Sequence, residues 1–394
     1  MQTDLPPSLP EPDADSLAHS ERAARYIHEH IERAGGSISF AEFMHYALYA
    51  PGLGYYSAGT RKFGEGGDFV TAPEISPLFG RVIARQCAGV LRNVPDGSVL
   101  EFGAGSGRLA LDVLRTLEEL DAVPAEYRIL EVSADLRERQ ERLLHEEVPG
   151  LASRIRWLDR MPDTHRGIVL ANEVLDALPV ERFMRRSDGV YQLRVVDEDG
   201  EFVFVDEPAP DVLAKALDSI ERDIGERLPD NYISEVSLAA PAWLGDVAQM
   251  LHHGMILLFD YGVSRREYYA PDRSEGWLRC HFRHRAHSDP LILTGIQDLT
   301  AWVDFSAIAE AAVSSGLDIL GYVSQSQFLI AGGIEAELHE LAELPLESQL
   351  QTAARIKILT LPGEMGENVK CIGLARGEVA TPPAFDSADR THTL

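Results

Sequence analysis

The run VLEFGAGSGR, from Val99 to Arg108, decides the fold of this chain. The residues VLEF have the apolar character of a strand, and they lead directly into three glycines at alternate positions and then into the helical pattern LALDVLRTL. Glycines let the backbone approach a ligand closely, and the first turn of a helix favours an anionic group. Because ligands of open α/β folds bind at the carboxyl edge of the sheet, the run predicts a nucleotide-like ligand there. A purely structural turn is the alternative.

Apolar strands alternate with helical segments from Ser98 onward, which is typical of a parallel sheet covered on both faces. The expected parallel strands are SVLEF (98–102), YRILEV (127–132), RIRWL (154–158), GIVLAN (167–172) and MILLFDYG (255–262). The segments LDILGYV (317–323) and NVKCIGLAR (368–376) predict a last antiparallel pair. We therefore expect an α/β fold of the Rossmann-like kind, with VYQLRVV and EFVFV forming a hairpin around the turn DEDG (197–200) in an inserted segment.

The region from 20 to 95 predicts helices broken by glycine-rich loops. Ser39 and Glu42 have the spacing of a capping box ahead of an apolar helix, which Pro51 and Gly52 end. The following stretch, 52–76, is rich in glycine and lacks periodicity, which is typical of a loop retained for function. Ser76 and Pro77 fit the cap and first turn of the next helix.

Composition limits the class of protein. The chain has 394 residues, which favours one large α/β domain with a subsidiary one. Its 36 basic and 63 acidic residues give a formal charge of −27, which argues against a general nucleic-acid binder and favours a cationic partner, although such charge also serves solubility. The three cysteines are too far apart to predict a zinc site or a disulfide framework.

Targeting signals are not evident in the sequence. Residues 1–15 are rich in proline and acid, without the apolar core of a secretory signal or the arginines of a transit peptide. The most hydrophobic run, MILLF, has strand length and is far below the roughly 20 residues that span a bilayer. We therefore expect a cytoplasmic protein without a membrane partner.

Polar residues follow the second and third expected strands. Glu131 ends the second strand, the position from which a carboxylate can accept both hydrogen bonds of a ribose diol, with a solvated strand-end acid as the alternative. Asp159, after the third strand, could approach the adenine side, although a lone loop aspartate is more often a cap or turn residue.

An amide and two acids follow the fourth strand. Asn172, Glu173 and Asp176 are expected at the same carboxyl edge as the glycine loop, where they make a receptor for a positive group. Carboxylates match a guanidinium in bidentate geometry and would hold an arginine beside the ligand of the glycine loop. Capping of the next helix by Glu173 and Asp176 is the alternative.

Two other polar groups lie later in the chain. His281, His284 and His287 have no defined ligand geometry, so no metal site is expected. Asp298, in GIQDLTAWVDF, is either a helix cap or part of the lining of a substrate cleft.

Taken together, these motifs resemble the MidA-type methyltransferases, whose mitochondrial members assist assembly of respiratory complex I. The resemblance extends from about Ala18 to Arg376 and rests on HYALYAPGLGYYS, GDFVTAPEISPLFG, EFGAGSGRLALDVL, EVSADLRERQ, ANEVLDALPV, FDYG, GIQDLTAWVDF and LPGEMGENVKC, in family order. It implies a class I, seven-stranded methyltransferase fold, S-adenosylmethionine as donor, and symmetric dimethylation of a protein arginine. A mitochondrial role is not expected, because no transit peptide is evident.

The strand-end residues and the resemblance together give the expected site. The resemblance itself implies donor contacts for Gly103, Gly105, Gly107 and Glu131, and it places Asn172 and Glu173 at the reaction centre. Glu173, Asn172 and Asp176 are the expected catalytic residues. The residues expected to bind the donor are Gly103, Ala104, Gly105, Ser106, Gly107, Glu131, Ser133, Asp159, Asn172, Thr71, Pro73 and Glu74. The last three belong to an N-terminal motif that is expected to fold over the donor site.

The expected organisation has six parts. They are a disordered tail (1–17), an N-terminal helical region covering the donor site (18–95), a donor-binding core (96–180), an inserted substrate-side subdomain (181–252), the remainder of the core (253–378) and a flexible tail (379–394). The alternative function is a donor-binding assembly factor that acts mainly by holding a partner. A dehydrogenase that uses NAD is disfavoured, because GxGxG lacks the dinucleotide spacing.

Overall fold

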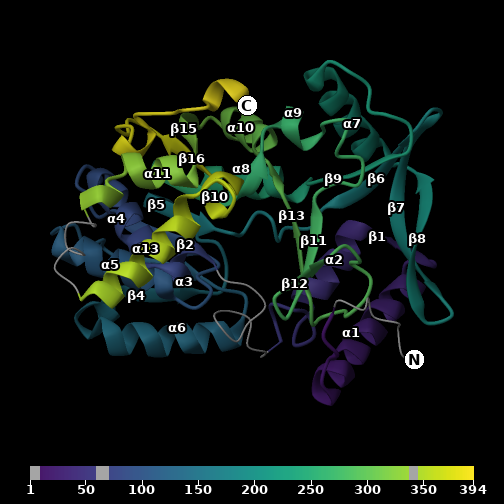
Figure 1. Ribbon diagram of the computed structural model, residues 1–394, viewed down its shortest axis with the longest axis horizontal. Helices are drawn as coiled ribbons and strands as arrows, with labels where there is room; N and C mark the ends of the chain where they lie inside the picture. Colours follow the sequence, from purple (N-terminus) through teal and green to yellow (C-terminus); the bar gives the residue numbers. More distant parts are fainter. Residues whose placement is uncertain (1–8, 59–70, 337–344) are drawn as a thin grey trace. The chain divides into compact units, whose positions relative to one another are not determined.

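The computed structural model describes residues 9–58, 71–336 and 345–394. The chain divides into two compact units, each built from three stretches. Unit 1 comprises Met1–Phe69, Asp176–Ala240 and Ser264–Asp304, and unit 2 comprises Val70–Leu175, Pro241–Val263 and Phe305–Leu394. The labels of Figure 1 are used for the elements of both units.

The largest sheet has eight strands, and the seven that belong to unit 2 have the order β15-β16-β10-β5-β2-β3-β4. Their bounds are β2 Ser98–Phe102, β3 Tyr127–Leu130, β4 Ile155–Leu158, β5 His165–Asn172, β10 Leu251–Val263, β15 Asp318–Ser324 and β16 Val369–Arg376. From β4 to β10 neighbouring strands are parallel, whereas β16 is antiparallel to both β10 and β15. The predicted strands and the predicted antiparallel pair are confirmed.

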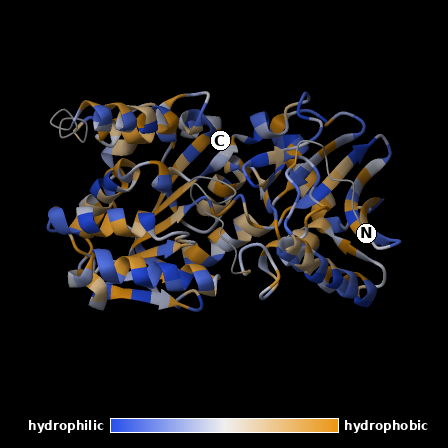
Figure 2. Ribbon diagram, turned by 60° about the horizontal axis from the view of Figure 1, so that its bottom comes forward, coloured by the Kyte–Doolittle hydropathy of each residue, from blue (hydrophilic) through white to orange (hydrophobic). Residues whose placement is uncertain are grey.

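Helices cover both faces of this sheet, and its central strands are therefore buried along most of their length. In β10, Leu257 and Phe259 belong to one apolar core, and the residues between and before them, Ile256 and Leu258, are equally buried. Such continuous apolar runs are typical of central parallel strands. The helices of unit 2 are α3 Ala72–Ile75, α4 Pro77–Leu91, α5 Arg108–Glu119, α6 Ala134–Glu147, α8 Ala239–Met250, α10 Phe305–Ser314, α11 Gln325–Ala331, α13 Leu346–Thr360 and α14 Met365–Asn368. Figure 2 shows hydrophilic and hydrophobic residues alternating along such helices.

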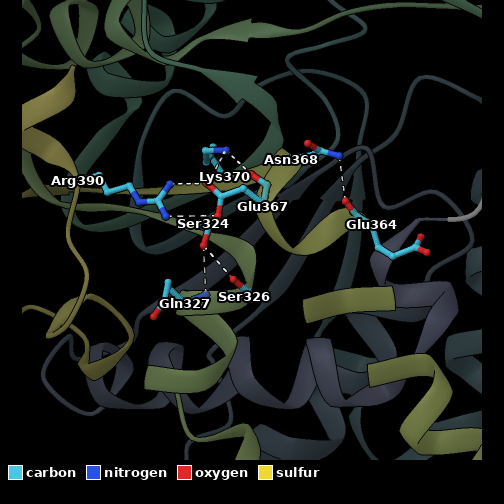
Figure 3. Close-up of polar contacts among 8 residues, drawn as sticks. All are labelled: Ser324, Ser326, Gln327, Glu364, Glu367, Asn368, Lys370 and Arg390. Atoms are coloured by element: carbon cyan, nitrogen blue, oxygen red, sulfur yellow. Dashed lines mark hydrogen bonds and ion pairs between the residues drawn. The ribbon is translucent and has the colours of Figure 1, made fainter. Parts of the chain in front are cut away.

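The C-terminal segment 379–394, which the sequence predicts to be flexible, packs against the rest of unit 2 instead. The backbone N–H of Tyr322 donates to Asp389 and the Arg390 N–H donates to the Tyr322 carbonyl, at 2.9 and 2.7 Å. The Arg390 guanidinium also pairs with Glu367, next to the buried Lys370 (Figure 3). The segment includes two short 3-10 helices, Pro383–Phe385 and Thr391–Thr393. The polar composition of the segment gives no indication of these contacts with residues far away in the sequence.

Phe385 anchors the segment in the apolar core. Its ring lies 5.6 Å from the ring of Phe328, edge to face. It also covers Gly321 and Gly373, which pair across β15 and β16, so closely that a Cβ on either glycine would lie within 2.7 Å of the ring. Glycine is required at both strand positions because the aromatic ring occupies the space of their side chains.

Replacing Phe385 by alanine is therefore expected to destabilise unit 2 by about 3 kcal/mol, because the cavity would be lined by rigid strands that cannot collapse. Chemical denaturation of the wild type and the variant measures the difference. Asp386→Ala, at the exposed neighbouring position, is the control and should change stability by less than about 0.5 kcal/mol. Equal midpoints for Phe385→Ala and the control would show that the segment does not contribute to the core.

Unit 1 combines the N-terminal helices with the inserted segment. The strand β1 (Ser37–Ser39) pairs with β7 (Gly189–Glu198) of the insertion, in a sheet completed by β6 (Glu181–Arg186), β8 (Glu201–Pro208) and β9 (Tyr232–Val236). A second sheet contains β11 Leu278–Phe282, β12 Arg285–His287 and β13 Asp298–Ala301. The remaining elements are α1 Ala14–Arg33, α2 Phe40–Tyr49, α7 Asp211–Ile224, α9 Arg265–Tyr268 and β14 Val303–Asp304.

Local predictions for unit 1 were accurate, whereas its boundaries were wrong. Ser39 and Glu42 form the predicted capping box of α2, and β7 and β8 form the predicted hairpin, with Glu198 opposite Glu201. However, α1 begins at Ala14, inside the segment 1–17 that was expected to be disordered. The predicted regions 18–95 and 181–252 are each divided between the units, because the pairing of β1 with β7 ties the N-terminal helices to the insertion. Among the described residues, no helix has both the length and the apolar character needed to cross a bilayer.

Candidate functional site

The glycine loop of unit 2 connects the buried strand β2 to α5. Gly103, Gly105 and Gly107 all have positive φ, at 62°, 54° and 85°. A side chain is strained in this region of φ, so the conformation explains why glycines alternate here. Gly107 is the N-cap of α5 and has no side chain to cap the first turn. The N–H groups of that turn are therefore available to an anionic ligand, as predicted.

Glu131 follows β3, and its carboxylate is held by two donors. One oxygen accepts a hydrogen bond from the Ser133 backbone N–H at 2.9 Å, and the other accepts one from Gln140 Nε2 at 3.0 Å. The Ser133 hydroxyl caps α6 and is fully buried, so its side chain has a structural role in addition to its predicted place near the donor. The carboxylate thus has a fixed orientation at the carboxyl edge of the sheet.

Gln140 is a residue that the sequence analysis missed. Its Nε2 also donates to the Gly105 carbonyl at 2.8 Å, and its Oε1 accepts a hydrogen bond from Trp157 Nε1 at 3.0 Å. It therefore joins the glycine loop, Glu131 and β4. The only sequence signal would have been a glutamine on the buried face of an amphipathic helix, and that signal does not identify a partner.

Asn172 and Glu173 lie at the carboxyl end of β5, as predicted. The Asn172 Nδ2 donates to Glu173 Oε1 at 3.2 Å, and the Ala72 N–H approaches the same oxygen at 3.4 Å. The backbone of Glu173 has a φ of 53°, in the left-handed region where a residue with a Cβ is strained, and its N–H donates to the Phe259 carbonyl at 2.8 Å. Strain of this kind, held by the surrounding hydrogen bonds, is concentrated at functional sites.

Asp260 fixes the turn that follows Glu173. This buried aspartate accepts hydrogen bonds from the backbone N–H groups of Val174 and Leu175, at 3.1 and 2.8 Å. It belongs to the motif FDYG at the end of β10, next to β5 in the sheet. The carboxylate of Asp260 therefore supports the backbone on which Glu173 is presented.

The N-terminal motif of unit 2 contacts the glycine loop. The Ser106 hydroxyl donates to Glu74, which lies on the short helix α3. Thr71 is the N-cap residue of α3, and Pro73 occupies its first turn. With the approach of the Ala72 N–H to Glu173, these contacts place α3 between the glycine loop and the end of β5.

Other predicted site residues have different surroundings. The side chain of Asp159 is 89% exposed and pairs with Arg137 at 2.8 Å, so its role toward adenine stays a prediction. Asp176 belongs to unit 1, where it is buried and its charge, with that of Asp298, helps burial to raise the pKa of Tyr56. Its role in catalysis also stays a prediction. The helix-cap interpretation of Asp298 is wrong, because this residue begins β13 and accepts a hydrogen bond from the Tyr56 hydroxyl at 2.9 Å.

Glu101 is a second buried acid near the glycine loop, in β2. Burial raises the pKa of its carboxyl from 4.5 to about 7, against the opposing effect of the hydrogen bond from the Tyr127 hydroxyl, at 2.7 Å; the charge of Glu131 raises it further. The pKa of this carboxyl is higher in the folded than in the unfolded protein, so its protonated form contributes to the free energy of unfolding. This contribution is complete below about pH 4.5 and is lost as the pH rises through about 7.

We expect Glu101→Gln to remove this pH dependence. Between about pH 5 and pH 8, the wild type should lose roughly 3 kcal/mol of stability that the variant retains, since each pKa unit corresponds to about 1.4 kcal/mol. Denaturation curves of both proteins across this range measure the difference. Because Asp112, whose pKa is raised to about 6 by burial, titrates in both, only the divergence between the curves reports on Glu101. Parallel curves would contradict the assignment.

The residues present fit S-adenosylmethionine. The glycine loop and the first turn of α5 suit a carboxylate, and the oriented Glu131 suits a ribose diol. Val132, directly after Glu131, is an apolar side chain that is 64% exposed at the same edge, and it suits a purine face. Asn172 Oδ1 is buried without a hydrogen-bond partner in the described residues, so an acceptor is available for a polar ligand. In the ranges that the structure describes, no group of three or more His, Cys, Asp or Glu side chains is arranged to hold a metal ion.

Comparisons with known proteins agree with this fit. Residues 82–323 match the model of a family of putative S-adenosyl-L-methionine-dependent methyltransferases. A crystal structure from Burkholderia thailandensis bound to S-adenosyl-homocysteine is similar over 98% of this chain and 100% of that chain, with 43% sequence identity and a TM-score of 0.92. Because the fold agrees along almost the whole chain, the expected class I methyltransferase fold is confirmed.

Curated relatives are named as arginine methyltransferases. A Drosophila melanogaster protein, "Protein arginine methyltransferase NDUFAF7 homolog, mitochondrial", is 30% identical over 95% of this chain and 90% of its own length. Its Danio rerio counterpart is 31% identical over 85% of this chain and 82% of its own length. These names overturn the expectation of a cytoplasmic location, because the relatives are mitochondrial proteins.

Proposed function

The chain belongs to the family of S-adenosyl-L-methionine-dependent methyltransferases, and from this premise we propose that its acceptor is an arginine side chain of a protein. The observation that carries the proposal is the placement of Glu173 and Asn172 at the end of β5, beside the strand whose glycine loop suits the donor. The names of the curated relatives and the negative charge of the chain support the same acceptor. The family resemblance implies symmetric dimethylation as the product.

The donor is held by residues on three neighbouring strand ends. The loop after β2 and the first turn of α5 would bind its carboxylate, and Glu131 after β3 would accept hydrogen bonds from the ribose hydroxyls. Asn172, at the end of β5, would offer its Oδ1, which has no hydrogen-bond partner among the described residues. S-adenosylmethionine supplies an electrophilic methyl group on a sulfonium. The protein contributes no nucleophile of its own, because an arginine nitrogen can take the methyl group directly: the N–C bond would form as the S–C bond breaks, S-adenosylhomocysteine would leave, and the methylated nitrogen would lose one proton.

Glu173 binds and orients the acceptor. Its carboxylate pairs with the guanidinium and thereby fixes the direction of one terminal nitrogen. The negative charge also stabilises the positive charge of the acceptor as it is removed from water. Asn172, the Ala72 N–H and the turn supported by Asp260 keep the Glu173 side chain in place, so that little reorganisation is needed when the acceptor binds.

Transfer of a labelled methyl group tests the proposal. The purified chain is incubated with methyl-labelled S-adenosylmethionine and a cell extract from which small molecules have been removed, and the products are separated by size and hydrolysed. We expect label in a protein fraction that yields methylated arginine after hydrolysis. Label in small molecules alone, or in another amino acid, would refute the arginine acceptor without affecting the family assignment.

Unit 1 favours a second function, that of a factor that holds a partner during assembly. Unit 1 has two sheets and an apolar core of its own, apart from the donor-binding sheet. Complementation with Glu173→Gln in cells that lack the protein separates the two functions. Restored cell function without methylation would favour the assembly role, and loss of both would favour catalysis.

A further inference from the structure

Gln140 connects the two parts of the donor site that come from different strands. It lies on α6 and is fully buried, so exposure to solvent does not explain its polar side chain. Its amide donates to the Gly105 carbonyl in the loop after β2 and to the Glu131 carboxylate after β3. A buried amide with these two partners is positioned to determine the geometry of both.

Only one of the two possible orientations of this amide satisfies its hydrogen-bond partners. Nε2 has two protons, and these go to Gly105 and Glu131, while Oε1 accepts the indole N–H of Trp157. If the amide were rotated by half a turn, its oxygen would face a carbonyl and a carboxylate, and its NH₂ group would face an N–H donor. Trp157 on β4 therefore determines which end of Gln140 faces the donor site.

We propose that Gln140 is a positioning residue for S-adenosylmethionine, held in its orientation by Trp157. It acts through Glu131 and the glycine loop. The Ser133 N–H and Gln140 Nε2 each donate to one oxygen of the Glu131 carboxylate, so the carboxylate is held in a fixed orientation, as a ribose diol requires. The link to Gly105 keeps the loop and the carboxylate at a constant separation. Binding of S-adenosylmethionine and binding of S-adenosylhomocysteine should both depend on Gln140, because the two molecules share the ribose.

Gln140→Glu tests the proposal with almost no change in shape. The new carboxylate still accepts from Trp157, but its second oxygen faces the Gly105 carbonyl and Glu131 with no proton to donate. By calorimetry with S-adenosylhomocysteine at about pH 8, we expect the dissociation constant to rise at least about tenfold. The loss should diminish at about pH 6, because the introduced carboxyl group can donate one hydrogen bond once it is protonated. A residue with a purely structural role would not give this pH profile.

Two further variants complete the test. Trp157→Phe removes the N–H that orients the amide and keeps a smaller aromatic ring, and we expect it to weaken binding by about threefold to tenfold. Glu141→Gln, the next residue on α6, is the matched control: Glu141 pairs with Arg137 at the surface, and binding should not change. Melting temperatures of all proteins without ligand separate a loss of affinity from a loss of folding.

The proposal is overturned if Gln140→Glu and Trp157→Phe fold and bind S-adenosylhomocysteine within twofold of the wild type at about pH 8. It is also overturned if the affinity of Gln140→Glu changes with pH in the same way as that of the wild type. Because the measurement uses donor binding alone, its result does not depend on whether the acceptor is an arginine.

Discussion

Glu173→Gln is expected to lower kcat by about a thousandfold while the affinity for S-adenosylmethionine stays within about threefold. The amide has the shape of the carboxylate and can still accept the contacts from Asn172 and the Ala72 N–H, so the local structure should persist. What is lost is the negative charge that binds a guanidinium and stabilises it in a partly dehydrated site. Removing one preorganised electrostatic group from an active site typically costs about a hundredfold to a thousandfold.

The measurement for Glu173→Gln combines single-turnover transfer with donor calorimetry. Glu118→Gln is the matched control, since Glu118 is an exposed acid near the end of α5, in the same unit. The control should keep the wild-type rate. A Glu173→Gln variant with more than about a tenth of the wild-type rate would contradict a role for this carboxylate at the reaction centre.

Glu131→Ala is expected to weaken donor binding by about a hundredfold or more. Both ribose hydroxyls lose a charged acceptor, and hydrogen bonds to charged groups are worth about 1.5–3 kcal/mol each. The substitution also leaves the Ser133 N–H and one of the two N–H groups of Gln140 Nε2 without an acceptor, so a lower melting temperature of the free protein should accompany the loss. Because the donor must bind before transfer, activity at low donor concentration should fall with the affinity.

Glu126→Ala is the control for Glu131→Ala. Glu126 lies just before the opposite end of β3, where it pairs with Arg128, far along the strand from the carboxyl edge. Calorimetry with S-adenosylhomocysteine should show unchanged binding for this variant. Equal affinities for Glu131→Ala and Glu126→Ala would mean that the ribose is bound elsewhere, and the arrangement of the donor site would have to be revised.

Much of unit 2 could be predicted from the sequence because its central strands are buried on both faces. A strand such as β10 must then be apolar at nearly every position, and the flanking helices supply the change of periodicity that marks its ends. Turn chemistry was equally informative: Asp199 and Gly200 both have positive φ in the hairpin of β7 and β8, as a two-residue turn requires. Local rules therefore determine these elements.

Features that depend on contacts between distant segments could not be predicted. The pairing of β1 with β7 joins residues about 160 positions apart, and no local pattern indicates it. The burial of Phe385 depends on glycines in two strands that precede it, and the role of Gln140 depends on a loop, a strand end and an indole that meet only in the fold. The candidate residues after each strand were accessible to sequence analysis, whereas the residues that orient them were not.

The most direct test of the central claim, that this methyltransferase modifies protein arginine, is a comparison of methylarginine sites by mass spectrometry. Cells with the wild-type chain, without it, and with only Glu173→Gln are grown with isotope-labelled methionine, so that every newly transferred methyl group carries the label. The account predicts that one protein, or a small set, carries labelled dimethylarginine with the wild type and lacks it in the other two. Identical methylarginine sites in all three would contradict the claim.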